Sequence, residues 1–321
     1  MIGGGAWGTA LAQVAAKAGG DVNLWALEAD VVEAINASHE NPLFLPGIAL
    51  DPAIRATGEI DSIGDSAAWL VVTPAQHMRS VLERAPRCDV PRILCSKGIE
   101  ERSGLLLHEV AAGACPGAPV AVLSGPTLAH EVARGLPTAV TLAAEDVDLA
   151  ENLRSYLAQP TFRIYVSDDI AGAEIGGAVK NVLAIACGVV DGRGLGENAR
   201  AALIARGFAE MTRFGIAMGA RPETLAGLSG LGDLVLTCSS TSSRNYSLGL
   251  GIGEGRSAQQ LMTDRRTVAE GAFTAPVLAR IARERGIDMP IVDSVDRLLA
   301  GASAESIVTE LLSRPPRLEG H

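Results

Sequence analysis

Aromatic residues, paired cysteines and closely spaced histidines are all scarce in this chain. Aromatics make up only 3% of its 321 residues, so Ala, Val, Leu and Ile must build the core, as in closely packed helices and parallel sheets. The five cysteines form an odd number without a C-x-x-C pair, which is typical of free thiols in a reducing cytoplasm. The histidines show no H-x-x-x-H spacing, so we expect no metal site.

Net positive charge and long apolar runs are missing as well. The formal net charge is −10 at pH 7, which argues against nucleic-acid binding because that requires a basic surface. The uncharged stretches 181–190 and 234–243 are too short to span a bilayer. The N-terminus runs directly into glycines and lacks the features of a signal peptide. We therefore expect no membrane insertion and a cytoplasmic location.

Lysine is far scarcer than arginine. Of the 27 basic residues only Lys17, Lys97 and Lys180 are lysines, which leaves 24 arginines. Arginine serves wherever a generic cation is sufficient. A retained lysine is therefore a candidate for work that a guanidinium cannot do, namely releasing a proton or acting as a compact point charge.

Short apolar runs alternate with helical stretches in the first half of the chain. The runs with the length and composition of buried strands are 21–26, 68–72, 92–95, 119–123, 137–143 and 161–166. Strands that alternate with helices, such as those expected over 9–16 and 104–112, predict a doubly wound α/β sheet of the Rossmann type. After Asp169 the apolar positions recur at steps of three and four. We therefore expect a dinucleotide-binding α/β domain over residues 1–168 and an all-α domain over 169–321.

Gly3-x-Gly5-x-x-Gly8 has the spacing of the phosphate-binding loop of a Rossmann unit. Its first glycine permits a tight turn, the second lets the backbone approach a pyrophosphate, and the third lets the following helix pack on the strand. A glycine-rich structural turn is the alternative, because the chain has 36 glycines. The helix and strand that follow, and the acidic Glu28 after them, favour dinucleotide binding.

Two features depart from the usual form of this motif. Only Met1 and Ile2 precede the loop, so we expect a sheet that lacks much of its central strand. The second strand ends in Leu27 and Glu28, where a basic residue would favour a 2′-phosphate. Glu28 could accept a hydrogen bond from a ribose 2′-hydroxyl, or it could be a solvated acidic residue.

Lys180 is an isolated charge in an apolar segment. It is the only charged residue between Glu174 and Asp191, and Gly176 and Gly177 lie close by. A lysine that reaches out from a helix edge is one interpretation. Burial, however, lowers the pKa of an amine toward neutrality, which suits a general base that accepts a hydroxyl proton.

Asp233 is isolated in the same way. It is the only charged residue between Glu223 and Arg244, and a lone carboxylate in an apolar run is costly unless it is paired. Lys180 is the obvious partner, and a helix-capping role is the alternative.

Lys97 and the segment 243–245 complete the candidate site. Lys97 directly follows the predicted strand 92–95, at the edge where ligands bind to open α/β sheets; a surface lysine before a turn is the alternative. Ser243, Arg244 and Asn245 begin a predicted helix. Free N–H groups and a guanidinium together make a phosphate site, although a solvated arginine would give the same pattern.

Eight segments in a fixed order resemble bacterial NAD(P)-dependent sn-glycerol-3-phosphate dehydrogenases along nearly the whole chain. They are GGGAWGTALA (3–12), NPLFLPG (41–47), SKGIE (96–100), SGPTLAHEVARGLPTAV (124–140), GGAVKNVLAI (176–185), GLGDLVLTC (230–238), SRN (243–245) and VAEG (268–271). Leu27 departs from the arginine common in that family.

The resemblance implies reversible hydride transfer between NAD or NADP and sn-glycerol 3-phosphate or dihydroxyacetone phosphate, supplying glycerol 3-phosphate for glycerophospholipid synthesis. It also implies a homodimer. The implied catalytic residues are Lys180, the proton-transfer group, with Asp233 and Lys97. The implied substrate contacts are Lys97, Gly125, Thr127, Lys180, Asp233, Ser243, Arg244 and Asn245. The implied cofactor contacts are Gly3, Gly5, Ala6, Trp7, Gly8, Leu27, Phe44, Lys97, Ala129, Arg244, Val268 and Glu270.

Two other functions fit parts of the pattern. A related 3-hydroxyacid dehydrogenase would share the fold plan and a catalytic lysine, but its carboxylate substrate would not need a phosphate site at 243–245. A non-catalytic dinucleotide-sensing module would keep the glycine loop without needing Lys97, Lys180 and Asp233 together.

Overall fold

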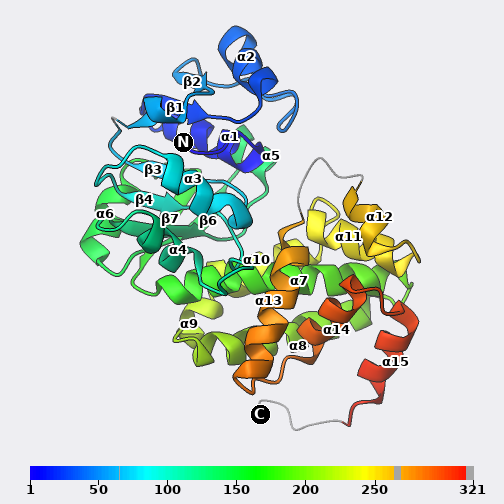
Figure 1. The fold of residues 1–321 in the computed structure, drawn as a ribbon. Helices are drawn as coiled ribbons and strands as arrows, with labels where there is room; N and C mark the ends of the chain where they lie inside the picture. The colour runs from blue at the N-terminus through cyan, green and yellow to red at the C-terminus, as the bar shows by residue number, and fades with distance from the viewer. Residues whose placement is uncertain (65, 264–268, 316–321) are drawn as a thin grey trace.

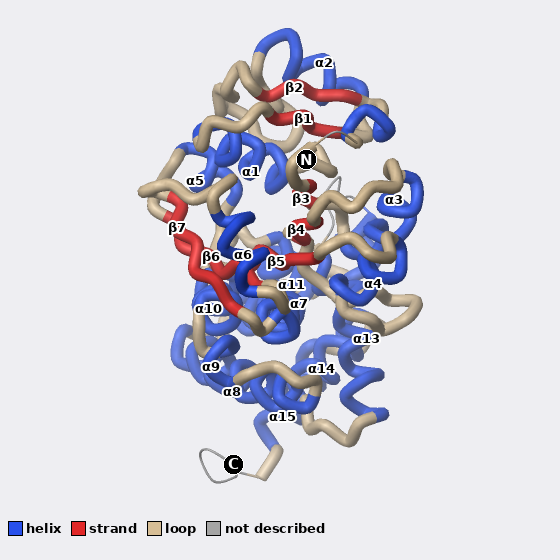
Figure 2. The backbone as a smooth tube through the Cα atoms, turned by 90° about the vertical axis from the view of Figure 1, so that its left-hand side faces the viewer, coloured by secondary structure: helices blue, strands red, loops and turns tan. Residues whose placement is uncertain are grey.

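A computed structural model describes residues 1–64, 66–263 and 269–315. Its strands gather in one half of the molecule, and helices alone fill the other half (Figures 1 and 2). The strands are β1 (Val22–Trp25), β2 (Ile54–Thr57), β3 (Trp69–Val71), β4 (Arg92–Leu94), β5 (Val120–Ser124), β6 (Thr138–Ala143) and β7 (Phe162–Ser167). The helices among them are α1 (Ala6–Lys17), α2 (Ala29–Ser38), α3 (Met78–Arg84), α4 (Leu107–Ala114), α5 (Ala129–Arg134) and α6 (Val147–Arg154).

The sheet is mainly parallel. β1 pairs with β2, and β3, β4 and β5 pair in sequence, all in the parallel direction. β6 runs antiparallel to β5, and β7 runs parallel to β6 at the far edge. The predicted Rossmann-type fold is therefore confirmed, although the apolar pattern gave no sign of β2 or of the reversal at β6.

The first residues of the chain take the central position in the sheet. Ile2 forms parallel bridges with Trp25 of β1 and Val71 of β3. Its N–H donates to the Leu70 carbonyl and its carbonyl accepts from the Val72 N–H, both at 2.8 Å. On the β1 side, Met1 O and Gly3 N exchange hydrogen bonds with Trp25. The expected central strand is thus very short, yet it is hydrogen-bonded on both sides.

The helical half is built around one long helix, α7 (Ile170–Gly192). Its surrounding helices are α8 (Glu197–Ala217), α9 (Pro222–Leu225), α10 (Asp233–Cys238), α11 (Arg244–Gly253), α12 (Ala258–Thr263), α13 (Glu270–Glu284), α14 (Pro290–Leu299) and α15 (Ala304–Ser313). α7 is apolar and long enough to cross a membrane, but its most apolar stretch is wholly buried inside the protein. Figure 1 shows it running through the middle of the helical half. The expected all-α region is confirmed.

Asp169 begins this half of the molecule. Its carboxylate caps α7 by accepting from the Gly172 N–H at 2.8 Å, and its other oxygen accepts from the Arg221 N–H at 2.8 Å. The division of the chain after residue 168 remains our proposal, which this capping supports.

Glycines let α7 and α11 pack with their backbones in contact. A methyl group at Gly249 of α11 would overlap the Ile185 carbonyl of α7, and one at Gly188 of α7 would overlap the Tyr246 carbonyl of α11. The close approach fixes where α11 begins, and therefore where Arg244 and Asn245 lie relative to α7.

We predict that Gly249→Ala lowers the free energy of unfolding by about 1–3 kcal/mol or more, because the added methyl forces these two helices apart. Chemical denaturation measures the change. Gly58→Ala is the control, since a methyl group there meets no atom within 4 Å, and it should leave the midpoint almost unchanged. Equal midpoints for the two variants would show that the helix pair is not closely packed.

Candidate active site

One buried carboxylate joins the two lysines that the sequence analysis singled out. Asp233 Oδ1 lies 2.5 Å from Lys180 Nζ, and Asp233 Oδ2 lies 2.6 Å from Lys97 Nζ. The Asp233 side chain is fully buried, and those of Lys180 and Lys97 are only 7% and 16% exposed. The predicted pairing of Lys180 with Asp233 is present, and Lys97 extends the pair to a cluster of three charges.

The backbone around Asp233 explains why its carboxylate lies opposite Lys180. Residues Leu228–Gly232 form one turn of π-helix immediately before α10, a local distortion common at functional sites. This turn lies directly against Gly176, where a methyl group would overlap the Ser229 carbonyl. Gly176 and Lys180 are four residues apart and so share one face of α7. The close approach at Gly176 therefore sets the Asp233 carboxylate beside the Lys180 amine.

Lys97 reaches the cluster from the carboxyl edge of the sheet. It follows β4, and its aliphatic chain passes Gly177 of α7, where an added Cβ would lie 3.2 Å from Lys97 Cγ. Its amine also donates to the Gly125 carbonyl at 3.0 Å, and the Thr127 hydroxyl donates to the same carbonyl at 3.3 Å. Four of the predicted substrate residues, Lys97, Gly125, Thr127 and Asp233, thus meet at one point.

Burial changes the acid–base behaviour of Lys180. Desolvation lowers the pKa of its amine from 10.5 to about 7, the neighbouring charge of Lys97 lowers it too, and the Asp233 carboxylate opposes both effects. A group with a pKa near the working pH can both accept and release a proton. Lys180 therefore has the property that a general acid–base residue needs.

The segment 243–245 forms the N-terminus of α11, as predicted. The Ser243 hydroxyl caps the helix by accepting from the Tyr246 N–H at 3.2 Å, and the Arg244 side chain is exposed. Asn245 is buried and joins two parts of the site. Its Nδ2 donates to Asn181 Oδ1 at 3.0 Å, next to Lys180, and its Oδ1 accepts from the Gly271 N–H at 2.9 Å.

The glycine loop has the close contacts that its motif requires. A Cβ at Gly3 would lie 2.8 Å from the Val72 carbonyl, and one at Gly8 would overlap the Gly3 carbonyl. Gly5, by contrast, faces open space and precedes Ala6, the first residue of α1. Gly3 and Gly8 therefore tighten the loop, whereas Gly5 leaves the helix N-terminus accessible to an anion.

Trp7 and Phe44 lie beside this loop. Both pack on the edge of the core of the α/β half. Asn41 anchors the loop that carries Phe44, because its Nδ2 donates to the Gly4 carbonyl at 2.9 Å and its Oδ1 accepts from the Phe44 N–H at 3.1 Å. The Nε1 of Trp7 is buried without a hydrogen-bond partner.

The other predicted cofactor residues lie at the ends of separate elements. Ala129 is the first residue of α5, and Leu27, after β1, is 75% exposed. Glu28 is half-buried at the start of α2 and caps nothing with its side chain. Glu270 begins α13, and its Oε1 accepts from the Ala75 N–H of the α/β half at 3.3 Å. Val268 lies outside the described residues.

Two polar neighbours of Lys180 were not predicted from the sequence. The Thr237 hydroxyl, one turn after Asp233 in α10, accepts from Lys180 Nζ at 2.9 Å. Asn181, the next residue of α7, accepts a hydrogen bond from Asn245 Nδ2. Nothing distinguishes either residue in the sequence, apart from the four-residue spacing of Thr237 from Asp233, which places both on one helix face.

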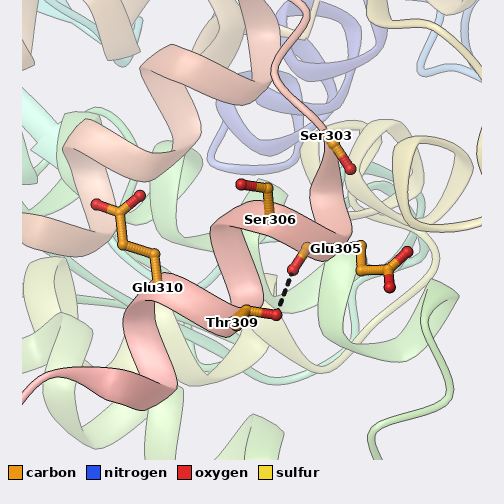
Figure 3. Close-up of a pocket in the computed structure, with 5 residues that line it drawn as sticks. All are labelled: Ser303, Glu305, Ser306, Thr309 and Glu310. Atoms are coloured by element: carbon orange, nitrogen blue, oxygen red, sulfur yellow. Dashed lines mark hydrogen bonds between the residues drawn. The ribbon is translucent and has the colours of Figure 1, made fainter.

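A hollow of about 530 Å³ lies on α15 and is lined by Ser303, Glu305, Ser306, Thr309 and Glu310 (Figure 3). Both of its carboxylates already pair with arginines, Glu310 with Arg297 at 2.8 Å and Glu305 with Arg193 at 4.0 Å, and α15 contributes no group to the cluster around Asp233, so this hollow is not the candidate site. Within the described part of the chain, no three His, Cys, Asp or Glu side chains converge to hold a metal ion.

Comparison with known proteins gives one consistent family. The family models for the NAD-dependent glycerol-3-phosphate dehydrogenase N-terminus and C-terminus match residues 1–150 and 169–309. The chain is 63% identical over 319 residues to a glycerol-3-phosphate dehydrogenase (NAD(P)+) of Erythrobacter litoralis, with 99% of this chain and 97% of that protein covered. It is 62% identical to the enzyme of the same name from Novosphingobium aromaticivorans, with 98% and 96% covered.

Among solved structures, the glycerol-3-phosphate dehydrogenase of Coxiella burnetii has a TM-score of 0.93 at 39% identity, with 98% of each chain covered.

Titration of Lys180 can be observed directly, because the chain has only three lysines. In protein labelled with ¹³C-lysine, we expect one Cε resonance to titrate near pH 7, and its absence from Lys180→Arg assigns it. Removal of the opposing charge in Asp233→Asn should move that midpoint lower still. A Lys180 resonance that titrates near pH 10, the ordinary range for lysine, would contradict the account.

Proposed function

Because this chain belongs to the NAD-dependent glycerol-3-phosphate dehydrogenase family, we propose that it transfers hydride reversibly between NAD(P) and sn-glycerol 3-phosphate or dihydroxyacetone phosphate. The observation that carries the proposal is the buried cluster in which Asp233 joins Lys180 and Lys97. In the cell this activity would supply glycerol 3-phosphate for glycerophospholipid synthesis. We further propose a cytoplasmic homodimer.

The residues at the carboxyl edge of the sheet fit a dinucleotide. Gly5 leaves the start of α1 open to a pyrophosphate. Trp7 Nε1 and Glu270 Oε2 are buried polar atoms without a hydrogen-bond partner, as expected where a ligand completes their hydrogen bonds. When bound, the nicotinamide supplies the carbon that exchanges hydride with C2 of the substrate. Leu27 and Glu28 favour NAD, because neither can bind a 2′-phosphate.

Lys180 is the proposed proton-transfer group. Its amine, with a pKa near 7, takes the proton from the C2 hydroxyl during oxidation and returns it during reduction. Asp233 holds the amine in place through Oδ1, and Thr237 accepts a second hydrogen bond from it. Two of the three hydrogen-bonding positions on the Lys180 amine are therefore occupied by the protein. The third position is left to exchange a proton with the substrate hydroxyl.

Lys97 and the N-terminus of α11 are the proposed substrate-binding groups. Asp233 and the Gly125 carbonyl fix the Lys97 amine, so it presents a positive charge without losing side-chain freedom on binding. Arg244 and the free N–H groups at the start of α11 bind the phosphate. Asn245 ties the start of α11 to α7 through its hydrogen bond to Asn181, the residue that follows Lys180.

Neither alternative function accounts for this arrangement. A 3-hydroxyacid dehydrogenase has no use for a phosphate site at the start of α11. A dinucleotide-sensing module does not require a buried cluster of three charges. Burying such a cluster costs desolvation free energy, which a catalytic role would explain.

The phosphate site is tested by comparing substrates. We predict that dihydroxyacetone phosphate supports turnover and that unphosphorylated dihydroxyacetone and 3-oxo acids do so poorly. Arg244→Gln should lower kcat/KM for the phosphorylated substrate roughly 10- to 150-fold, the worth of hydrogen bonds to a charged group, with little effect on dihydroxyacetone. The exposed Arg283, which pairs with Asp293 on the surface, supplies the control variant Arg283→Gln. Comparable kcat/KM values with and without the phosphate would contradict the assignment.

A further inference from the structure

Among the described residues, six buried side-chain atoms lack a hydrogen-bond partner: Trp7 Nε1, His39 Nδ1, Thr73 Oγ1, Arg92 Nε, Ser124 Oγ and Glu270 Oε2. Such atoms are rare in folded proteins and each needs an explanation. Two of them, on Trp7 and Glu270, belong to residues already proposed to contact the cofactor. The pattern suggests that an unpartnered atom at the carboxyl edge of the sheet marks a ligand contact.

Thr73 lies at that edge and has no role in the site described so far. It follows β3 after one residue, and only 4% of its surface is exposed. Its backbone is engaged, because the Ser96 hydroxyl donates to the Thr73 carbonyl at 2.5 Å. The side-chain hydroxyl, which can donate one hydrogen bond and accept two, has no hydrogen-bond partner.

The position of Thr73 in the sheet is that of a dinucleotide contact. β1 lies on one side of the central segment Met1–Gly3 and β3 lies on the other, so the strand order reverses between this segment and β3. Open α/β sheets bind their ligands at the carboxyl ends of the strands where the order reverses. Thr73 stands at this reversal, and a Cβ at Gly3 would lie 3.3 Å from its backbone nitrogen.

The neighbours of Thr73 along the chain point to the same ligand. Two residues later, the Ala75 N–H donates to Glu270 Oε1 at 3.3 Å. Thr73 therefore lies between the first glycine of the phosphate-binding loop and the carboxylate proposed to contact the cofactor. Of the other unpartnered atoms, Ser124 Oγ also lies at the carboxyl edge, because Ser124 ends β5, but it lies beside Gly177 of α7, where Lys97 passes, and not at the reversal of strand order. His39 and Arg92 do not share the position of Thr73, since His39 follows α2 and Arg92 begins β4 at the opposite edge.

We propose that Thr73 is a further cofactor-binding residue, whose hydroxyl forms a hydrogen bond with a ribose or pyrophosphate oxygen of the dinucleotide. The proposal rests on the proposed use of NAD(P). It accounts for a threonine at a buried position that a valine of the same shape would fill without leaving a polar group unpaired.

The isosteric variant Thr73→Val separates this role from a structural one, because its two expected effects have opposite signs. Without cofactor the variant should be more stable to chemical denaturation, since a buried unpaired hydroxyl is removed. Its Kd for NADH, measured by calorimetry, should rise roughly three- to tenfold. Thr73→Ser, which keeps the hydroxyl, should bind NADH within about twofold of the wild type.

Thr9→Val is the matched control for stability. The Thr9 hydroxyl is also buried in the glycine-loop region, but it donates to the Gly4 carbonyl at 3.3 Å and accepts from Asn41 Nδ2 at 2.8 Å. Its removal should therefore destabilise the unliganded protein. Parallel titration with ADP locates the contact: a weakened Kd for ADP places it on the adenosine diphosphate half, and a loss confined to NADH places it on the nicotinamide riboside.

Unchanged NADH affinity in Thr73→Val would overturn the inference, and so would a less stable unliganded variant, since the hydroxyl would then already have a partner within the protein. Failure of the wild-type protein to bind NADH would instead contradict the proposed function itself.

Discussion

The Asp233 carboxylate, held between two lysine amines, is the interaction on which the rest of this site depends. Burying an ion costs several kcal/mol even after relaxation, and the attraction between partners repays that cost only when the geometry is good. Here each carboxylate oxygen of Asp233 pairs with a different amine. Two lysines against one aspartate leave one excess positive charge, and burial disfavours that excess charge. Desolvation lowers the pKa of Lys180 to about 7, so its amine can lose a proton near neutral pH, and the Lys97–Asp233 pair that then remains is balanced in charge. Burial thus gives an ordinary amine the pKa that its proposed role in proton transfer requires.

The fold supplies this geometry through contacts that only small residues permit. Gly176 admits the π-helical turn before Asp233, Gly177 admits the stem of Lys97, and Gly249 brings α11 against α7. Each contact fixes a functional group from a different part of the chain relative to the one buried helix. α7 therefore positions Lys180, Lys97 and the proposed phosphate site at the start of α11 relative to one another.

Much of this arrangement could be predicted from particular residues. Lys180 and Asp233 stand alone in apolar segments, so their pairing followed from the cost of burying a single charge, and the Gly3–Gly8 spacing indicated the loop before α1. The ion pair between Lys97 and Asp233 could not be predicted, because 136 residues separate the two along the chain. Only the packing of the sheet edge on α7 brings them together. Thr237 and Thr73 were equally hidden, since a threonine hydroxyl carries no charge that would mark its position. The reversal at β6 escaped detection because apolar patterning reports burial and not strand direction.

The central claim is that Lys180 acts by exchanging a proton and not by its charge alone, and Lys180→Arg tests it most directly. Arginine keeps the positive charge but stays protonated at every workable pH. The account predicts a fall in kcat of about 10²–10⁴-fold, with the fold and NADH affinity retained. Lys97→Arg should mainly raise KM, and Lys17→Arg, in an exposed position on α1, should change almost nothing. A Lys180→Arg enzyme that keeps more than about a tenth of the wild-type kcat would contradict the claim and show that only the charge matters at this position.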